Sequence, residues 1–143
     1  NSYAKEGNIL SLGKTPAVRY KSASNEIIVT AESNNDNIAK ERIIGRIKDL
    51  KLQKWNNIII NYSAGTMDLF FNGKLISSVP EVVPYQSFEV LEVGQDNGTS
   101  GGLANLLYFR NSLDIYSIRY LYNSFKNSNP PSLSHPNLTI IPQ

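Results

Sequence analysis

The loop over residues 94–102 has the composition best suited to ligand binding. It holds Asp96 and Asn97 among glycine, serine and threonine residues, and carboxylate, amide and backbone oxygens are the ligands that Ca²⁺ prefers. Asp96 and Asn97 are therefore candidate calcium or sugar ligands. Trp55, the single tryptophan, is a further candidate ligand residue because an indole ring can stack on a sugar ring. The composition of the loop also suits an ordinary chain turn, since glycine and Asx residues adopt tight-turn geometry.

The residue types of hydrolytic catalysis are thinly represented. Glycoside hydrolysis needs two carboxyl groups that flank the scissile bond, and the nearest pair, Glu89 and Glu92, is spaced so that the side chains point to opposite faces of a strand. The single histidine, His135, stands between Ser134 and Pro136, where it is poorly placed for a triad. The chain has no cysteine, so it has no thiolate nucleophile, thiolate metal site or disulfide. We expect no catalytic residues, no enzyme activity and no cofactor apart from the candidate calcium.

The charge balance argues against nucleic acid as a partner. The formal net charge is +2 and the pI is about 8.8, whereas nucleic-acid binding usually needs a concentrated basic face. One local excess of basic residues, diluted by Glu41 and Asp49, is interpreted as a solvated connection or a sheet edge, where lysines block strand addition, in preference to a polyanion site. Its members are Lys40, Arg42, Arg46, Lys48, Lys51 and Lys54.

Apolar runs such as residues 58–60 are much shorter than the ~20 residues that a membrane span needs. We therefore expect no membrane-spanning segment.

The elements that must position these residues are mostly strands. Short runs of β-branched and aromatic residues, separated by Asn, Gly, Ser and Pro, predict an all-β chain. The chain has 143 residues, the size of one domain. We expect the domain over residues 1–129 and an extended, proline-rich tail or linker over 130–143. The predicted strands cover residues 8–12, 17–21, 26–31, 41–47, 57–62, 67–71, 74–78, 88–93 and 103–110, and residues 33–37 are predicted as a loop.

Two local signals are stronger than the rest. Asn72-Gly73 between two strand runs predicts a hairpin with a type I′ turn, because both central residues need φ > 0. The second signal is a short helix. Asp114 is a good N-cap, with Leu113 and Ile118 placed for a hydrophobic staple, and apolar residues follow on one face. We expect this helix to end between residues 123 and 129 and to close one end of the sandwich through Leu113, Ile118, Leu121 and Tyr122.

The order of these signals from residue 54 to residue 122 resembles concanavalin A-like (laminin-G-like) domains. The resemblance includes the phrase 52–57 (Leu-Gln-Lys-Trp-Asn-Asn), which is similar to uncharacterised lectin-like domains of large DNA viruses. The residues that carry it are Trp55-Asn56-Asn57-Ile58, Asp68-Leu69-Phe70-Phe71-Asn72-Gly73-Lys74-Leu75, Val93-Gly94, Gly101-Gly102-Leu103-Ala104-Asn105-Leu106, Tyr108-Phe109, and Leu113 with Ile118 and Tyr122.

This resemblance implies a two-sheet antiparallel β-sandwich of the jelly-roll type, with one short C-terminal helix. In such domains the tryptophan at the position of Trp55 more often packs in the core or at its margin than against a ligand. The family pattern also has a first strand that is not evident before Asn8, and the tail after Pro131 is one candidate to supply it.

Fold alone does not define activity, since this family includes lectins, adhesion modules, glycoside hydrolases and structural domains. We expect a non-catalytic module of a larger polypeptide, with a structural or interaction role in a viral particle or at an extracellular surface. Its partners would be other protein subunits or flanking domains. The alternative is a carbohydrate- or receptor-binding lectin-like domain, with or without the help of calcium.

Overall fold

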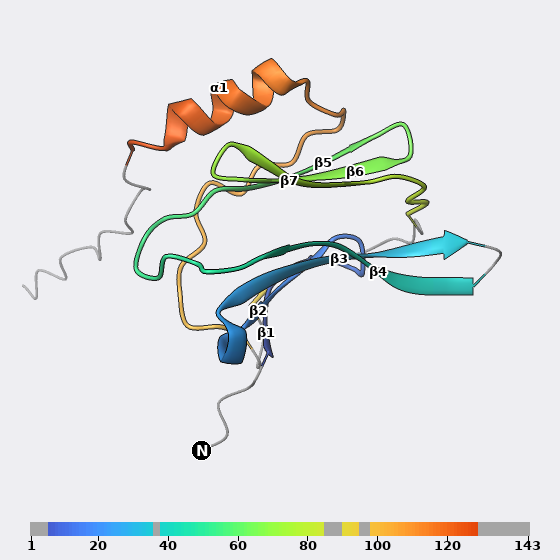
Figure 1. Cartoon of the computed structure of the whole chain (residues 1–143), viewed down its shortest axis with the longest axis horizontal. Helices are drawn as coiled ribbons and strands as arrows, with labels where there is room; N and C mark the ends of the chain where they lie inside the picture. The colour runs from blue at the N-terminus through green and yellow to red at the C-terminus, as the bar shows by residue number, and fades with distance from the viewer. Residues whose placement is uncertain (1–5, 36–37, 85–89, 95–97, 129–143) are drawn as a thin grey trace, which may run out of the picture.

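The computed structural model describes residues 6–35, 38–84, 90–94 and 98–128. These residues form two antiparallel sheets and one α-helix in three layers, with the helix over the smaller sheet and the smaller sheet over the larger one (Figure 1). The strand order is β4-β3-β2-β1-β8 in the larger sheet and β5-β6-β7 in the smaller. Over the described residues, the prediction of an all-β, two-sheet antiparallel sandwich with a short C-terminal helix is confirmed.

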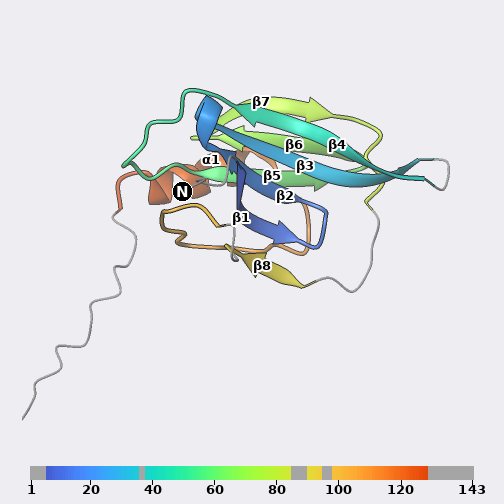
Figure 2. The ribbon, with the colours of Figure 1, turned by 90° about the horizontal axis from the view of Figure 1, so that it is seen from below.

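The larger sheet begins as a four-stranded meander. Its strands are β1 (Glu6–Leu12), β2 (Ala17–Lys21), β3 (Glu26–Asn35) and β4 (Ile38–Ile47), and β8 (Leu91–Val93) pairs with the other side of β1. Figure 2 shows this sheet from below, with β4 at one edge and β8 at the other. A short 3-10 turn, Ser22–Ser24, joins β2 to β3.

A β-bulge interrupts the regular alternation of side chains in β4. Val29 pairs with Gly45 and Thr30 pairs with Ile43, so Ile44 has no residue opposite it. Ile44 is 1% exposed, whereas Ile43 is 49% exposed. The extra residue shifts the alternation of the strand, so that the adjacent residues Ile44 and Gly45 are both buried and Ile47 is buried after them.

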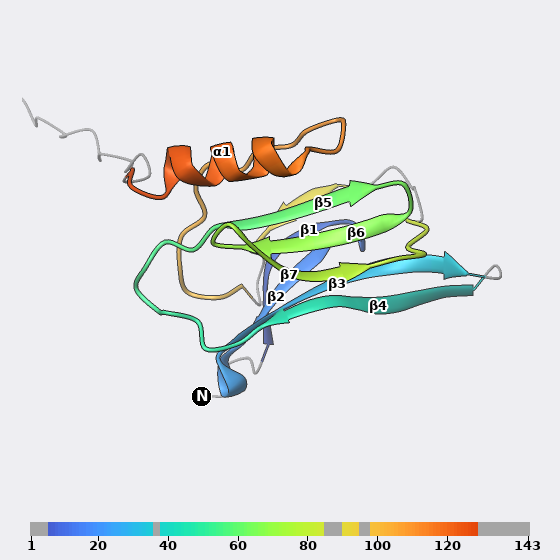
Figure 3. The same cartoon turned by 45° about the horizontal axis from the view of Figure 1, so that its top comes forward.

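The smaller sheet consists of two consecutive hairpins, as predicted (Figure 3). Its strands are β5 (Ile58–Ser63), β6 (Thr66–Phe71) and β7 (Lys74–Val79). Asn72 and Gly73 form the turn between β6 and β7 with φ angles of 48° and 77°. The positive φ at both positions is what a type I′ turn requires.

The turn between β5 and β6 is tighter than the sequence suggested. Ser63 pairs with Thr66, so the loop itself is only Ala64 and Gly65, which have φ angles of 47° and 80°. This is a second turn with positive φ at both central residues. Its first position is held by alanine, whose Cβ makes that conformation unfavourable.

The core lies between the two sheets. Its buried members come from both layers and include Val18, Ile27, Val29, Ala31, Ile44, Ile47, Leu50, Met67, Leu69 and Val82. Gly45 allows β4 and β7 to approach closely, because a Cβ at this position would lie 2.5 Å from Ser77 Oγ and 2.6 Å from Leu69 Cδ2. In the space that glycine leaves, the Ser77 hydroxyl donates a hydrogen bond to the carbonyl of Ile44 at 2.6 Å.

The segment after β7 ties the two sheets together although it forms no strand. The Val82 N–H donates to the carbonyl of Gly65, and the Tyr62 hydroxyl donates to the carbonyl of Val82, both at 2.9 Å. On the other sheet, the Asn34 N–H donates to the carbonyl of Val83 at 3.0 Å. The Val82 side chain is fully buried in the core. This loop, which lies between Pro80 and Pro84, therefore closes an end of the sandwich.

The helix α1 (Ile115–Phe125) begins at the predicted cap and ends in the predicted range. The Asp114 carboxylate accepts a hydrogen bond of 2.7 Å from the Ser117 backbone N–H, and this bond lowers the pKa of Asp114 from its usual 3.8. Ile118 is 1% exposed, while Leu121 is only partly buried. Ile118 is therefore the main apolar anchor of the helix.

The position of the helix differs from the prediction. It lies over the outer face of the smaller sheet rather than across an end of the sandwich (Figure 1). The ring of Tyr122 rests on the β6–β7 turn, where a Cβ on Gly73 would lie 2.5 Å from Tyr122 Cδ1. Phe70 is also buried, yet it lies outside the cluster between the sheets. The outer face of this sheet thus supports a second, smaller apolar contact.

One predicted strand does not form, and several predicted boundaries differ from the observed ones. Residues 103–110 form no strand, because an apolar pattern does not supply the neighbouring backbone that a strand must pair with. The predicted loop over 33–37 is strand as far as Asn35, with residues 36–37 outside the described part. Of the predicted strand 88–93, only Leu91–Val93 is strand, and residues 88–89 are not described.

The one α-helix among the described residues, α1, lacks the length and the apolar character that a membrane-spanning helix requires.

Candidate functional site

Trp55 stands on a connection between β4 and β5 that is fixed by asparagine side chains. Asn56 Nδ2 donates to the carbonyls of Lys51 and Lys54 at 3.2 and 3.1 Å. Asn72 Nδ2 donates to Asn56 Oδ1 at 3.2 Å, which links the connection to the β6–β7 turn. These bonds hold the backbone on either side of the indole ring in one conformation.

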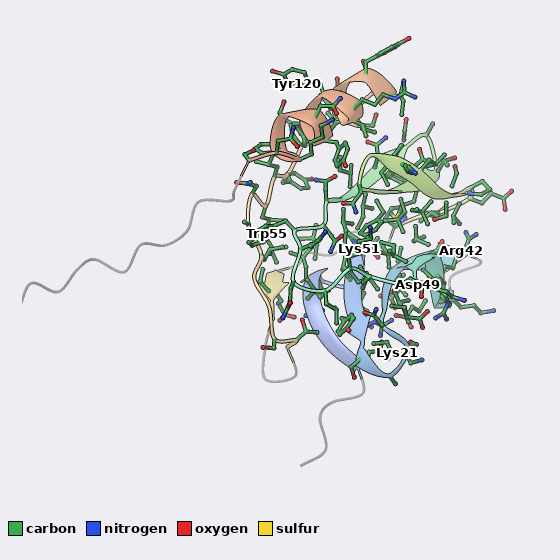
Figure 4. All side chains as sticks on the ribbon, turned by 60° about the vertical axis from the view of Figure 1, so that its left-hand side comes forward. Lys21, Arg42, Asp49, Lys51, Trp55 and Tyr120 are labelled. Carbon is green, nitrogen blue, oxygen red and sulfur yellow. The ribbon has the colours of Figure 1, made fainter. Side chains whose placement is uncertain are left out.

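Trp55 itself lies at the surface, so of the two expected positions, in the core or at its margin, the first is excluded. Its exposed fraction is 59%, and Figure 4 shows it at the side of the molecule, away from Tyr120 on the helix. The ring edge is close to Gly102, where a Cβ would lie 3.2 Å from Trp55 Cη2. Glycine at this position therefore leaves room for the indole beside the end of the loop over residues 94–102. An exposed, backbone-supported indole of this kind suits stacking on the apolar face of a sugar.

The other candidate ligand residues, Asp96 and Asn97, lie outside the described residues. The described part of their loop, residues 98–102, contributes one threonine and one serine hydroxyl but no acidic side chain. Within the described residues, no group of three or more His, Asp or Glu side chains is arranged to hold a metal ion. The calcium site stays a prediction from the sequence.

Most of the carboxylates on the larger sheet are committed to ion pairs or hydrogen bonds. Arg19 on β2 lies 3.2 Å from Glu6 on β1 and also pairs with Glu41 on β4. Thr30 on β3 completes this row, since its hydroxyl donates to Glu41 Oε1 at 2.9 Å. A similar ion pair joins Glu26 Oε1 and Arg46 Nη1, which lie 3.1 Å apart. Of the two glutamates considered for glycoside hydrolysis, Glu92 lies on β8, and Glu89, like His135, is outside the described residues.

The basic cluster occupies a sheet edge and the connection that follows it, as predicted. Lys40, Arg42 and Arg46 belong to the edge strand β4. Both arginines are engaged within the molecule: Arg42 Nη1 donates to the carbonyl of Glu81 at 2.6 Å, and Arg46 Nη1 donates to Glu26 Oε1 at 3.1 Å. Two members of the cluster are therefore engaged in contacts within the molecule, which supports the sheet-edge interpretation.

The stretch between β8 and the helix is the most apolar exposed part of the described chain. Leu103, Leu106, Leu107 and Tyr108 are all exposed, although the sequence pattern predicted an interior strand here. Further along, residues 109–121 form a groove of about 420 Å³. Its lining residues are Phe109, Leu113, Tyr116, Ser117, Tyr120 and Leu121. Sequence analysis missed this groove, although Tyr116 and Tyr120 stand one helical turn apart on the face opposite the anchor Ile118.

Asn61 is the first residue of an N-glycosylation sequon, but its side chain is used structurally. It is 9% exposed, and both polar atoms of its carboxamide bond the main chain of Leu113. The sequon is therefore inaccessible in the folded domain.

No family model matches this chain, and no curated protein does. Among solved structures, it is similar to an S-layer domain-containing protein (residues 221–444) from Clostridium thermocellum ATCC 27405, with a TM-score of 0.40 and 15% sequence identity. The match covers 85% of this chain and 65% of that one. A likeness of this strength carries no functional assignment.

Proposed function

We propose that the chain is a non-catalytic β-sandwich module of a larger polypeptide, with a structural or interaction role. The observation that carries this proposal is the exposed apolar segment formed by Leu103, Leu106, Leu107 and Tyr108, whose exposed fractions are 47%, 47%, 53% and 82%. Soluble proteins rarely leave contiguous apolar surface of this kind open unless it is an interaction site. The segment would pack against a flanking domain or a neighbouring subunit.

The chemistry of the sandwich surface agrees with a non-catalytic role. On the larger sheet, Arg19 and Arg46 hold glutamates in ion pairs, so these carboxylates are engaged within the molecule and do not form a free pair that could flank a scissile bond. The sequence resemblance to concanavalin A-like domains of large DNA viruses supports a jelly-roll module in a viral particle or at an extracellular surface.

The second candidate is carbohydrate binding, and the position of Trp55 favours it. The exposed indole lies beside Gly102, next to the loop that carries Asp96 and Asn97. A sugar stacked on this ring would lie near the described end of that loop, at Gly102. In this case calcium, held by the loop, would be the one cofactor to consider.

Sedimentation velocity and a glycan array separate the two candidates. An unpartnered apolar segment should cause concentration-dependent self-association of the isolated chain, and Leu106→Glu should abolish it. Leu52→Glu, at another exposed leucine, is the matched control and should leave the association unchanged. Strict monomer behaviour at all concentrations, together with glycan retention that Trp55→Ala removes, would favour the lectin. Hydrolysis of any polysaccharide would contradict both.

A further inference from the structure

The groove beside α1 presents two aromatic rings that no described residue covers. Tyr116 and Tyr120 are 77% and 73% exposed, and their spacing of four residues brings them onto the same side of the helix. Phe109 and Leu113 contribute apolar surface beneath them. Ser117 adds a hydroxyl at the wall, so the groove combines aromatic surface with hydrogen-bond donors.

The segment that follows the helix has the composition that such grooves recognise. Residues 129–143 contain four prolines, Pro130, Pro131, Pro136 and Pro142, together with four aliphatic residues, Leu133, Leu138, Ile140 and Ile141. Proline-rich chain favours the polyproline II conformation, which has no internal hydrogen bonds. It docks on aromatic-lined grooves at low entropic cost, and its free carbonyls accept hydrogen bonds from tyrosine and serine hydroxyls.

The length of the segment allows it to return to the groove. The described chain ends at Ser128, just past the helix, and Tyr116 lies 12 residues before it. At about 1.5 Å per residue this part of the helix spans roughly 18 Å. Extended polyproline II chain covers about 3.1 Å per residue, so about six residues bridge the same distance. When about two to four further residues are allowed for the reversal of chain direction after the helix, residues 133–138 are the ones that reach the two tyrosines.

The geometry points to this groove as the docking site of the chain's own proline-rich tail, with residues 133–138 over Tyr116 and Tyr120. The direct covalent connection to α1 favours the intramolecular arrangement, since a short tether gives an effective concentration on the order of millimolar. Leu133, Pro136 and Leu138 would supply the apolar contacts, and the rings would supply the faces against which they pack.

Paramagnetic relaxation tests this arrangement directly, because the chain has no cysteine and a single Asn137→Cys substitution can carry a nitroxide. In the spin-labelled, ¹⁵N-labelled chain, the amide signals of residues 113–121 should broaden strongly and those of β4 should not. Mixing ¹⁵N-labelled chain without nitroxide and spin-labelled chain without ¹⁵N should give no broadening. Comparable broadening in the mixed sample would show that the tail docks on other copies and would overturn the proposal, as would unbroadened helix signals in the doubly labelled chain.

A peptide of residues 129–143 provides a second, independent measurement. It should bind a chain truncated after Ser128, and the combined Tyr116→Ala and Tyr120→Ala substitutions should weaken binding at least about tenfold. Leu52→Ala, at an exposed position on the β4–β5 connection, should leave binding unchanged. Equal binding by both variants would overturn the proposal. Leu106→Glu, which tests the interface of the proposed function, should leave tail docking intact, so the two proposals can fail separately.

Discussion

The side chain of Asn61 and the main chain of Leu113 form a reciprocal pair of hydrogen bonds. The Leu113 N–H donates to Asn61 Oδ1 at 2.9 Å, and Asn61 Nδ2 donates to the Leu113 carbonyl at 3.1 Å. The carboxamide thus satisfies both backbone groups, as a neighbouring strand would. Because Leu113 immediately precedes the cap Asp114, the pair sets where the chain meets β5 and where the helix begins.

Replacing Asn61 with alanine should lower the free energy of unfolding by about 2–3 kcal/mol, since two hydrogen bonds are lost and the partner groups of Leu113 are left without their acceptor and donor. Urea unfolding followed by circular dichroism measures the change. Ser63→Ala is the control: it removes the same sequon without touching the carboxamide and should change stability little. Equal stability of the two variants would mean that the helix is positioned without this pair.

Gly73→Ala should destabilise the domain more than Gly65→Ala. Both glycines have positive φ, 77° and 80°, so both substitutions cost about 1 kcal/mol or more in the backbone. Only Gly73 also faces a side chain, the Tyr122 ring, whereas nothing lies within 4 Å of a Cβ at Gly65. Thermal unfolding of the two variants gives the comparison.

Tyr122→Ala in the Gly73→Ala background isolates the steric part of this difference. The double substitution should recover part of the loss, and a double-mutant cycle quantifies the coupling. If Gly73→Ala and Gly65→Ala cost the same, and the cycle shows no coupling, the helix does not rest on the β6–β7 turn.

Ala64→Gly should stabilise the domain by about 1 kcal/mol. Ala64 has a φ of 47°, a conformation that costs an alanine roughly 1–2 kcal/mol, offset in part by the greater freedom of glycine in the unfolded chain. Ser63→Gly, at the last residue of β5, should instead destabilise. A midpoint of urea unfolding that falls in both variants would contradict the tight two-residue turn.

Ile118→Ala should cost about 2–5 kcal/mol, the usual range for removing a fully buried aliphatic side chain. Leu121→Ala should cost less, because Leu121 is only partly buried. Chemical unfolding of the two variants is the measurement, and the order of the two losses is the result that matters. A larger loss at Leu121 would place the apolar anchor one helical turn further along.

The cap at Asp114 should make the stability of the helix depend on pH in the acid range. Its folded pKa lies below the usual 3.8, so the unfolded chain binds more protons there, and the contribution of the carboxylate is complete above pH 3.8 and is lost as the pH falls through the folded pKa. Asp114→Asn keeps an oxygen acceptor but does not titrate. The difference in melting temperature between the two proteins, followed from about pH 6 to pH 2, should shrink below pH 3.8. A constant difference would contradict the prediction.

Local signals in the sequence were sufficient for much of the fold. The Asn72-Gly73 turn and the Asp114 cap were predictable because their conformations depend on a few adjacent residues. Residues 103–110 were not, because their apolar pattern is also compatible with a surface segment, and strand formation depends on a partner elsewhere in the chain. The burial of Val82 between two prolines was missed for the same reason: its contacts come from β5 and β3.

The candidate site was only partly predictable. Trp55 was identified by residue type, but its exposure depends on the asparagine bonds of the β4–β5 connection and on its contact with Gly102, which sequence spacing does not show. Tyr116 and Tyr120 carried a usable signal, since they lie four residues apart on the helix. The apolar pattern on the opposite side of the same helix is the stronger signal, because it marks the face that packs on the sheet.

The attachment of the helix also determines how the domain would respond to mechanical load. Tension applied between Glu6 and Ser128 acts at one end on β1, which is paired with β2 on one side and with β8 on the other. At the other end it acts on α1, whose attachment to the smaller sheet depends on the Asn61–Leu113 hydrogen bonds, the buried Ile118 side chain and the contact of Tyr122 with the β6–β7 turn. Because these contacts can give way one after another while the ladders on both sides of β1 hold together, stretching should peel the helix from the smaller sheet first. The domain would lengthen by this step with both sheets still intact, and the outer face of β5-β6-β7 would open under force.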